Sequence, residues 1–173
     1  MDIIVEYAWN KDNYLKASYQ NYMHSRLNKG FKILAGTFLI VLILYYVITM
    51  NFTEHAFVIS VTVAFLTIYL GRWPIFRWQL KRQFKKYAQK DCLVRWVINE
   101  TQLKSMVEGI REGIVSWDSI TKAVKTKDGF LIYRYPVYHW FPFSGFPGPD
   151  QQVLFEMLLE RKVKNYRKDK AHK

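Results

Sequence analysis

The sequence predicts an α+β protein in which a two-helix transmembrane hairpin is inserted between an N-terminal strand and helix and a C-terminal antiparallel sheet closed by one helix. Two apolar segments, 33–50 and 55–70, contain no Lys, Arg, Asp or Glu and meet at the short sequence NFTEH. From residue 93 onward, apolar residues recur at every second position, which is typical of strands. The predicted parts are an N-terminal strand and helix (1–30), the two-span hairpin (31–72), a basic juxtamembrane helix (73–90), an antiparallel domain (91–166) and a basic tail (167–173).

The chain begins with DIIVEYAW, residues 2–9, which has the composition of a strand. Asn10 or Asp12 can then cap a helix that continues to Arg26, because both side chains accept hydrogen bonds from the free N–H groups of a first turn. The expected apolar face of this helix consists of Tyr14 or Leu15, Tyr19, and Tyr22 or Met23. Since a lone strand is not stable in water, residues 2–9 are expected to pair with the later sheet.

The two apolar segments are best explained as two membrane spans. Residues 33–50 approach the ~20 residues that a helix needs to cross the hydrocarbon core. One continuous helix over 33–70 would be about 57 Å long at ~1.5 Å per residue, nearly twice the thickness of that core. Two alternatives stay open: a soluble helical hairpin in a core, which would normally show a polar stripe, and a re-entrant hairpin that does not cross.

Basic residues flank both apolar segments, and the connecting NFTEH has no Lys or Arg. Arg26, Lys29 and Lys32 precede the first segment, and a longer basic run follows the second. The positive-inside rule then predicts a multi-pass protein of the inner (plasma) membrane, with both termini in the cytoplasm and NFTEH outside.

The basic run is GRWPIFRWQLKRQFKKYAQK, residues 71–90. Pro74 can open a helix in which Phe76, Leu80 and Phe84 recur at helical spacing beside a row of basic residues. Each Lys or Arg near an anionic leaflet contributes roughly 1 kcal/mol. We therefore expect this segment to lie at a phospholipid membrane with anionic headgroups, through Arg72, Trp73, Arg77, Trp78, Lys81, Arg82, Lys85 and Lys86.

The net charge of +12 is concentrated in two blocks. Residues 71–90 carry seven Lys or Arg and no acid, and residues 161–173 carry seven more with one Asp, so these blocks sum to +13 and the rest nets to −1. A nucleic-acid-binding domain normally spreads basic residues over a docking face, so we expect no nucleic-acid partner. The single cysteine, Cys92, excludes an internal disulfide, and the polar first 32 residues do not resemble a cleavable signal peptide.

Consecutive short strands are expected in the C-terminal part. They cover 93–98, 102–107, the region around 113–117, 119–126, 129–135 and 138–143. Asp128-Gly129 between two alternating runs is the strongest hairpin signal in the chain. Pro149-Asp150 can then cap a final helix from Gln151 to Tyr166, which closes an antiparallel meander.

Several of these segments resemble the YcxB-like family of bacterial membrane proteins. They are Asp12-Asn13-Tyr14-Leu15 after the first strand, the hairpin with basic flanks, VSWDSI at 115–120, TKAVKTKDGFLIY at 121–133, and HWFP at 139–142. The likeness covers nearly the whole chain and implies a cytoplasmic domain similar to pleckstrin-homology (PH) domains, so residues 91–166 are expected to be PH-like. It implies no established activity. The chain departs from the pattern after Tyr133, where RYPVYHWFPFSGF is unusually aromatic.

The sequence shows no catalytic constellation. The four histidines, His24, His55, His139 and His172, lie in different contexts without a second ligand at metal spacing. Ser144 lacks the context of a nucleophile elbow. We therefore expect a non-enzymatic protein without a metal or cofactor, and an enzyme is the weakest of the readings.

The leading expectation is a membrane-anchored interaction module of regulatory or immunity type that binds an unidentified protein partner. Aromatic residues with little charge among them are enriched at binding hot spots. The expected contact residues are Tyr135, Tyr138, Trp140 and Phe143. The alternative is a sensor of anionic lipid headgroups that uses Lys122, Lys125 and Lys127, although a solvated strand face explains these lysines equally well.

Overall fold

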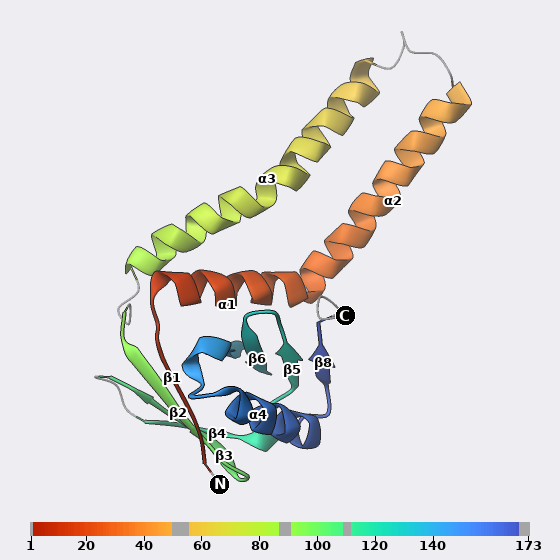
Figure 1. Ribbon diagram of the computed structural model, residues 1–173. Helices are drawn as coiled ribbons and strands as arrows, with labels where there is room; N and C mark the ends of the chain where they lie inside the picture. Colours follow the sequence, from red (N-terminus) through yellow and green to blue (C-terminus); the bar gives the residue numbers. More distant parts are fainter. Residues whose placement is uncertain (1, 50–55, 87–90, 109–111, 170–173) are drawn as a thin grey trace. The chain divides into compact units, whose positions relative to one another are not determined.

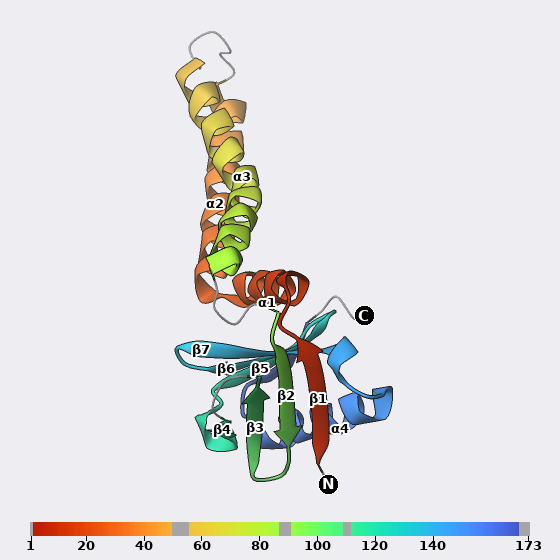
Figure 2. The same cartoon turned by 90° about the vertical axis from the view of Figure 1, so that its left-hand side faces the viewer.

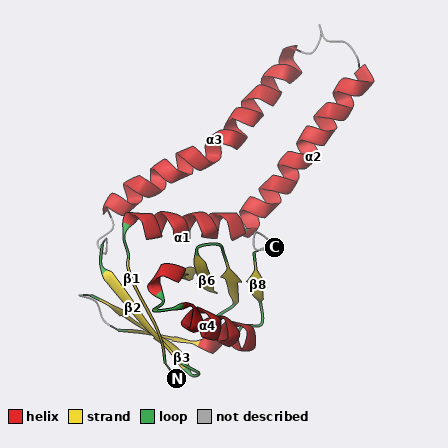
Figure 3. Cartoon of the chain, in the orientation of Figure 1, coloured by secondary structure: helices red, strands yellow, loops and turns green. Residues whose placement is uncertain are grey.

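The computed structural model describes residues 2–49, 56–86, 91–108 and 112–169 and confirms an α+β protein (Figure 1). The chain divides into two compact units. One consists of Met1–Asn21 with Phe84–Lys173, and the other is Tyr22–Gln83. Figure 3 shows that the strands belong to the first unit, whereas the second is helical.

The first sheet joins the start of the chain to its C-terminal part (Figure 2). It is antiparallel, in the order β1 (Ile3–Ala8), β2 (Leu93–Ile98), β3 (Gln102–Val107), β4 (Gly113–Ser116). Val5 pairs with Trp96 and both side chains are buried, whereas Glu6 and Arg95 beside them are exposed. The expected pairing of the first strand is therefore confirmed.

The second sheet has the order β7-β6-β5-β8. Its strands are β5 (Lys122–Lys125), β6 (Gly129–Arg134), β7 (Val137–Pro142) and β8 (Tyr166–Lys168). The hairpin signal is confirmed: the Thr126 N–H donates to the Gly129 carbonyl at 2.8 Å. A Cβ atom at Gly129 would lie 2.8 Å from Pro142 Cα, so only glycine fits beside β7.

The expected single meander is wrong in two respects. A 3-10 turn, η1 (Trp117–Ser119), separates β4 from β5, and the strands on either side belong to different sheets. The short strand β8, which was not expected, pairs parallel with β5. The helix predicted to reach Tyr166 is α4 (Pro149–Lys162); it ends four residues earlier because Val163 is buried in an extended conformation and Tyr166 already belongs to β8.

The core lies between the two sheets and α4. Aromatic rings dominate it: Phe155 of α4 lies 5.2 Å from both Phe130 and Phe141, measured between ring centroids, and Phe141 lies 5.0 Å from Trp96. Trp117 anchors the turn between the sheets, because its Nε1 donates to the Asn99 carbonyl at 2.9 Å. A second short turn, η2 (Phe143–Gly145), leads from β7 to α4.

The first helix, α1 (Lys11–His24), begins as the sequence predicts, since Asn10 Oδ1 accepts a hydrogen bond from the Asn13 N–H at 3.0 Å. Its expected aromatic face also makes contacts, since the Tyr14 ring lies 5.3 Å from that of Phe84 and the Tyr22 ring 5.1 Å from that of Phe76, but these side chains are only half-buried. The described side chains that are most buried are Ala17, Ser18 and Gln20, and Gln20 Nε2 donates to Asp128 Oδ2 at 3.0 Å. Small and hydrogen-bonded residues therefore pack this part of α1 against the sheet.

The second unit contains α2 (Arg26–Thr49) and most of α3 (Ala56–Lys86), which lie side by side in Figures 1 and 2. Phe38 and Phe65 are in contact, with ring centroids 4.7 Å apart. The expected turn at 51–55 lies outside the described residues. No separate helix begins at Pro74, which corrects the prediction: Pro74 lies inside α3, and the basic run continues the apolar helix.

One part of this unit has the length and composition of a membrane-spanning helix. Among the described residues, Ile59–Lys86 is the one helical segment long and apolar enough to cross a membrane, with a mean hydropathy of 1.4 in a window that is 0% buried. A shorter apolar helical segment covers Gly30–Leu42. A hairpin with two crossings is thus not established by these helices alone.

Candidate functional site

The end of α3 carries a surface of basic and aromatic side chains, here called the α3 basic surface. It comprises Arg77, Trp78, Lys81, Arg82, Lys85 and Lys86. Trp78 is 56% exposed, and the Arg82 guanidinium lies 4.6 Å from the centroid of its ring, a cation–π geometry. Leu80 and Phe84, by contrast, are each 5% exposed. The helix therefore has one buried apolar stripe and one exposed basic face, as its spacing predicts.

Arg72 and Trp73, also expected at the membrane surface, have partners within their own unit. The Arg72 guanidinium lies 3.8 Å from the centroid of the Phe31 ring and 5.7 Å from that of Tyr22. The Trp73 and Tyr22 rings are 5.9 Å apart. These contacts join Arg72 and Trp73 to the neighbouring helices, and both side chains are half-buried.

The apolar helices expose large hydrophobic side chains. Ile33 is 72% exposed, Leu34 64% and Val63 56%. Water-soluble monomers seldom expose contiguous apolar patches of this kind, and such patches mark membrane or protein contacts. An exposed apolar helix that continues into an exposed basic face has the chemistry of a membrane anchor.

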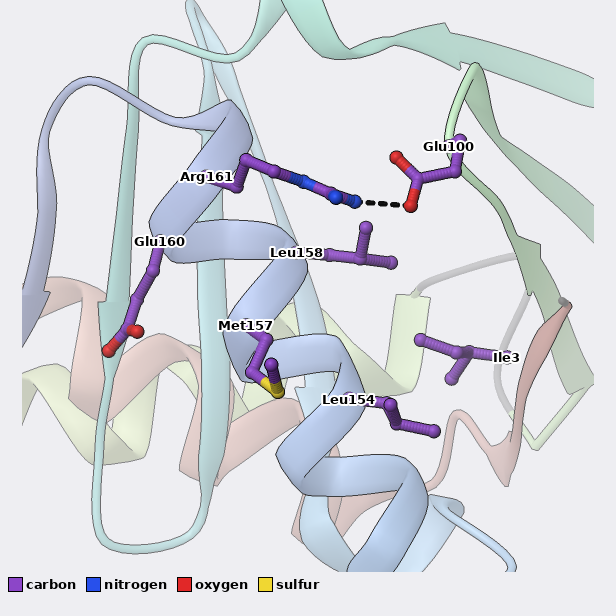
Figure 4. A pocket seen from close by; sticks show the side chains of 7 residues that line it. All are labelled: Ile3, Glu100, Leu154, Met157, Leu158, Glu160 and Arg161. Carbon is purple, nitrogen blue, oxygen red and sulfur yellow. Dashed lines mark hydrogen bonds and ion pairs between the residues drawn. The ribbon is translucent and has the colours of Figure 1, made fainter.

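A groove of the first unit lies along α4 and is here called the α4 groove (Figure 4). Its volume is about 590 Å³, and it is lined by Ile3, Glu100, Leu154, Met157, Leu158, Glu160 and Arg161. Figure 4 shows Leu154 and Leu158 pointing from α4 toward Ile3 of β1, whereas Glu160 points to the other side of the helix. The floor of the groove is therefore apolar.

Paired charges border the α4 groove. Arg161 forms an ion pair with Glu100 in the β2–β3 turn, and Lys162 lies 3.5 Å from the same carboxylate. The hydrogen bond from Arg161, with a further contribution from Lys162, lowers the pKa of Glu100. On the apolar side, Met157 is 59% exposed. The two carboxylates of the lining, Glu100 and Glu160, are both held in ion pairs, so the groove suits the binding of an apolar side chain.

The lysines considered for headgroup binding are placed differently from one another. Lys125 Nζ lies 2.7 Å from Glu156 Oε2, and Lys122 Nζ lies 4.8 Å from the centroid of the Tyr133 ring. Lys127 is exposed in the turn. Burial tends to raise the pKa of Glu156, but hydrogen bonds from Lys125, Lys168 and Tyr166 outweigh it and lower the pKa. A carboxylate therefore already neutralises Lys125.

The structure separates the four aromatic residues expected to bind a partner. Tyr135 is 89% exposed at the β6–β7 turn, and Tyr138 is half-buried. Trp140 is 1% exposed, and the Phe143 ring packs edge-on against Phe130 with centroids 5.3 Å apart. Trp140 and Phe143 thus contribute to the packing of the core. Of the four residues, Tyr135 is the one whose side chain is largely exposed to solvent.

His139 lies inside the fold. Its ring meets Trp96 edge-on at 5.1 Å, and burial, together with the charge of Arg134, lowers its pKa to about 4. Across the described part of the chain, no group of three or more His, Cys, Asp or Glu residues could hold a metal ion.

The α4 groove was not found by sequence reasoning. Glu100 and Arg161 are 61 positions apart, and Ile3 lies at the other end of the chain. No single segment of the sequence carries a signal for this groove. Comparison with protein-family models, with curated proteins and with solved structures finds no match to this chain. The resemblance to the YcxB-like family and the PH-like character of residues 91–166 therefore stay predictions.

Proposed function

We propose that this chain is a non-enzymatic, membrane-anchored interaction module. Its apolar helices hold it in the inner (plasma) membrane, and its two-sheet unit presents a binding surface to a protein partner in the cytoplasm. One observation carries the proposal: in α3 an exposed apolar helix continues without a break into the α3 basic surface. That order of side chains matches the order of hydrocarbon, interface and cytoplasm across a membrane.

Two crossings agree with the position of the folded unit in the sequence. Its first part precedes the apolar helices and its second part follows them, and the strands β1 and β2 from these two parts pair directly. An even number of crossings leaves both parts on the same side of the membrane. The basic flanks favour the cytoplasmic side.

Partner binding is proposed at the α4 groove, with Tyr135 as a second contact point. The groove combines an apolar floor with border charges that are already paired, so an apolar side chain of a partner protein could enter without leaving a buried charge unpaired. Headgroup sensing through the strand lysines has less support, because Lys125 is paired with Glu156.

Membrane extraction tests the anchor. Membranes that contain the full chain are washed with high salt, then with alkaline carbonate, and finally with detergent. We expect release by detergent alone, because buried apolar helices are insensitive to salt and pH. Release by salt would instead show a peripheral protein held by the α3 basic surface.

Site-specific photo-crosslinking tests the partner. A photoreactive amino acid at Met157, which is 59% exposed at the groove, is compared with one at Lys164, which is exposed after α4. We expect one dominant protein adduct from position 157 and none from position 164. Adducts to lipid alone from both positions would favour the headgroup sensor.

A further inference from the structure

A second cavity lies inside the first unit, between the two sheets, and is here called the aromatic cavity. Its volume is about 140 Å³. The walls come from the four strands β1, β2, β3 and β7 and from Trp9, which follows β1. They consist of Tyr7, Trp9, Val94, Trp96, Val107, Tyr138, His139 and Trp140. Six of these eight residues are aromatic rings, and none is Lys, Arg, Asp or Glu.

Polar ring atoms of this lining have no hydrogen-bond partner in the described part of the chain. They are Trp96 Nε1, His139 Nε2 and Trp140 Nε1, all fully buried. Trp96 Nε1 forms a weak side-chain interaction with the Tyr7 hydroxyl that opposes the burial raising the pKa of Tyr7, but this contact does not reach full hydrogen-bond geometry. An unpaired buried donor destabilises the fold, and most buried polar groups of native proteins have a hydrogen-bond partner.

Neighbouring groups of the same kinds are paired, which makes this cluster distinct. Trp117 Nε1 donates to the Asn99 carbonyl at 2.9 Å, and the Tyr7 hydroxyl donates to the Trp140 carbonyl at 2.6 Å. The fold therefore satisfies a buried indole and a buried phenol nearby. Three unpaired atoms line this one cavity. The Tyr133 hydroxyl, outside the cavity, is a further buried atom without a hydrogen-bond partner among the described residues.

Rigid elements hold the two central groups. Trp96 is on β2 and His139 on β7, so one comes from each sheet, and their rings meet edge-on at 71° with centroids 5.1 Å apart. An indole N–H is only a donor, whereas a neutral imidazole nitrogen is a donor or an acceptor according to its tautomer. A ligand that pairs with Trp96 must therefore supply an acceptor.

We propose that the aromatic cavity binds a small, uncharged, single-ring molecule that carries a hydrogen-bond-accepting oxygen, with Trp96 Nε1–H as the donor to that oxygen. The wall carries no charged side chain, which disfavours a small inorganic ion because burial of an uncompensated charge is costly. The ring faces and edges of the wall favour a planar partner. The volume equals that of about five waters at ~30 Å³ each, which suits one ring.

The competing ligand is a quaternary ammonium ion, which aromatic cages also bind. Such an ion has no acceptor and would leave the Trp96 donor unpaired. Water alone is the other competitor. Water can accept from Trp96, but it gains nothing from the aromatic wall.

The test uses the full-length chain in lipid nanodiscs and follows the indole N–H resonances by ¹⁵N–¹H NMR. Benzamide is the probe, toluene lacks its acceptor, and tetramethylammonium is the cationic competitor. We expect benzamide to shift the Trp96 resonance saturably and downfield. The Trp117 resonance, whose N–H is already bonded to Asn99, is the matched control and should not move.

Trp96→Phe removes the donor while it keeps an aromatic ring. We expect benzamide to bind the variant about tenfold more weakly, which corresponds to about 1.4 kcal/mol, and toluene to bind both proteins equally. Three results on the unaltered chain would overturn the proposal: no shift with benzamide, equal affinity for toluene, or tighter binding of tetramethylammonium. These titrations need no variant, so they decide the question even if Trp96→Phe does not fold.

Discussion

Arg161 on α4 reaches across the groove to Glu100 in the β2–β3 turn and forms an ion pair that joins the helix to the first sheet (Figure 4). The side chains are 60% and 56% exposed, and such pairs contribute little to stability. The pair therefore matters more for the shape of the α4 groove than for the stability of the fold.

Arg161→Gln should leave the melting temperature unchanged and weaken photo-crosslinking from Met157. The reason is that the exposed pair adds little to folding but closes one end of the groove. Circular dichroism and the crosslinking yield measure the two effects. Lys164→Gln, which changes an exposed residue outside the groove, is the control. A large drop in melting temperature would contradict the assignment.

Glu156→Gln should cost about 1–2 kcal/mol of unfolding free energy at pH 7, because the carboxylate binds Lys125 at 2.7 Å and Lys168 at 3.0 Å. Its pKa is lower in the folded state, so the stabilisation is present above the unfolded pKa of about 4.5 and is lost as pH falls through the folded value.

Urea unfolding of the chain in micelles at pH 7 and pH 3 measures this effect. The difference between the unaltered chain and Glu156→Gln should shrink at the lower pH. Glu160→Gln is the matched control on the same helix, since its carboxylate is more exposed and contacts Lys168 at 3.0 Å. An equal loss of unfolding free energy in both variants at both pH values would contradict the role given to the contacts of Glu156 with Lys125 and Lys168.

Trp140→Ala and Tyr135→Ala should differ sharply. Trp140 is 1% exposed, and removal of such a side chain costs ~3–5 kcal/mol. Tyr135 is 89% exposed, and changes at such positions are usually within about 0.5 kcal/mol. Chemical unfolding measures both. A stable Trp140→Ala that has lost partner binding would restore Trp140 as a contact residue.

Deletion of residues 2–9 should abolish the cooperative unfolding of the first unit rather than trim a tail. Ile3 and Val5 are 2% and 0% exposed, and β1 supplies an edge of the first sheet. Deletion of residues 170–173 is the control. A near-UV circular dichroism spectrum that survives the loss of 2–9 would show that β1 is dispensable.

Removal of four positive charges from α3 should weaken its contact with anionic lipid by up to ~4 kcal/mol, at about 1 kcal/mol per residue. The variant replaces Arg77, Lys81, Arg82 and Lys85 by Gln. An environment-sensitive dye on Trp78→Cys, in a Cys92→Ser background, reports the contact in nanodiscs with anionic or neutral lipid. We expect the spectral difference between the two lipids to disappear in the neutralised chain. The pair Lys164→Gln and Arg167→Gln, exposed after α4, should preserve it.

Local patterns predicted the local elements well. The strand segments at 93–98 and 102–107 match β2 and β3, and Asn10 caps α1 as expected. Alternation and capping depend on neighbours in the sequence, so they are visible without a structure.

Features that depend on distant residues were missed. Ser18 and Gln20 are buried because Tyr138 and Asp128 lie opposite them, and no periodicity reveals such partners. The three-residue β8 exists because β5 offers a free edge. The α4 groove and the aromatic cavity are built by residues from both ends of the chain, so neither could be read from one segment.

The central claim is that the apolar helices cross a membrane twice and leave the folded unit in the cytoplasm. The most direct measurement is labelling of single cysteines in intact bacterial cells with a membrane-impermeant maleimide, in a Cys92→Ser background. Thr53→Cys lies in the connecting sequence, and Ser144→Cys lies at an exposed position of η2. We predict that position 53 is labelled in intact cells and position 144 only after permeabilisation. Protection of both positions until permeabilisation would contradict two crossings.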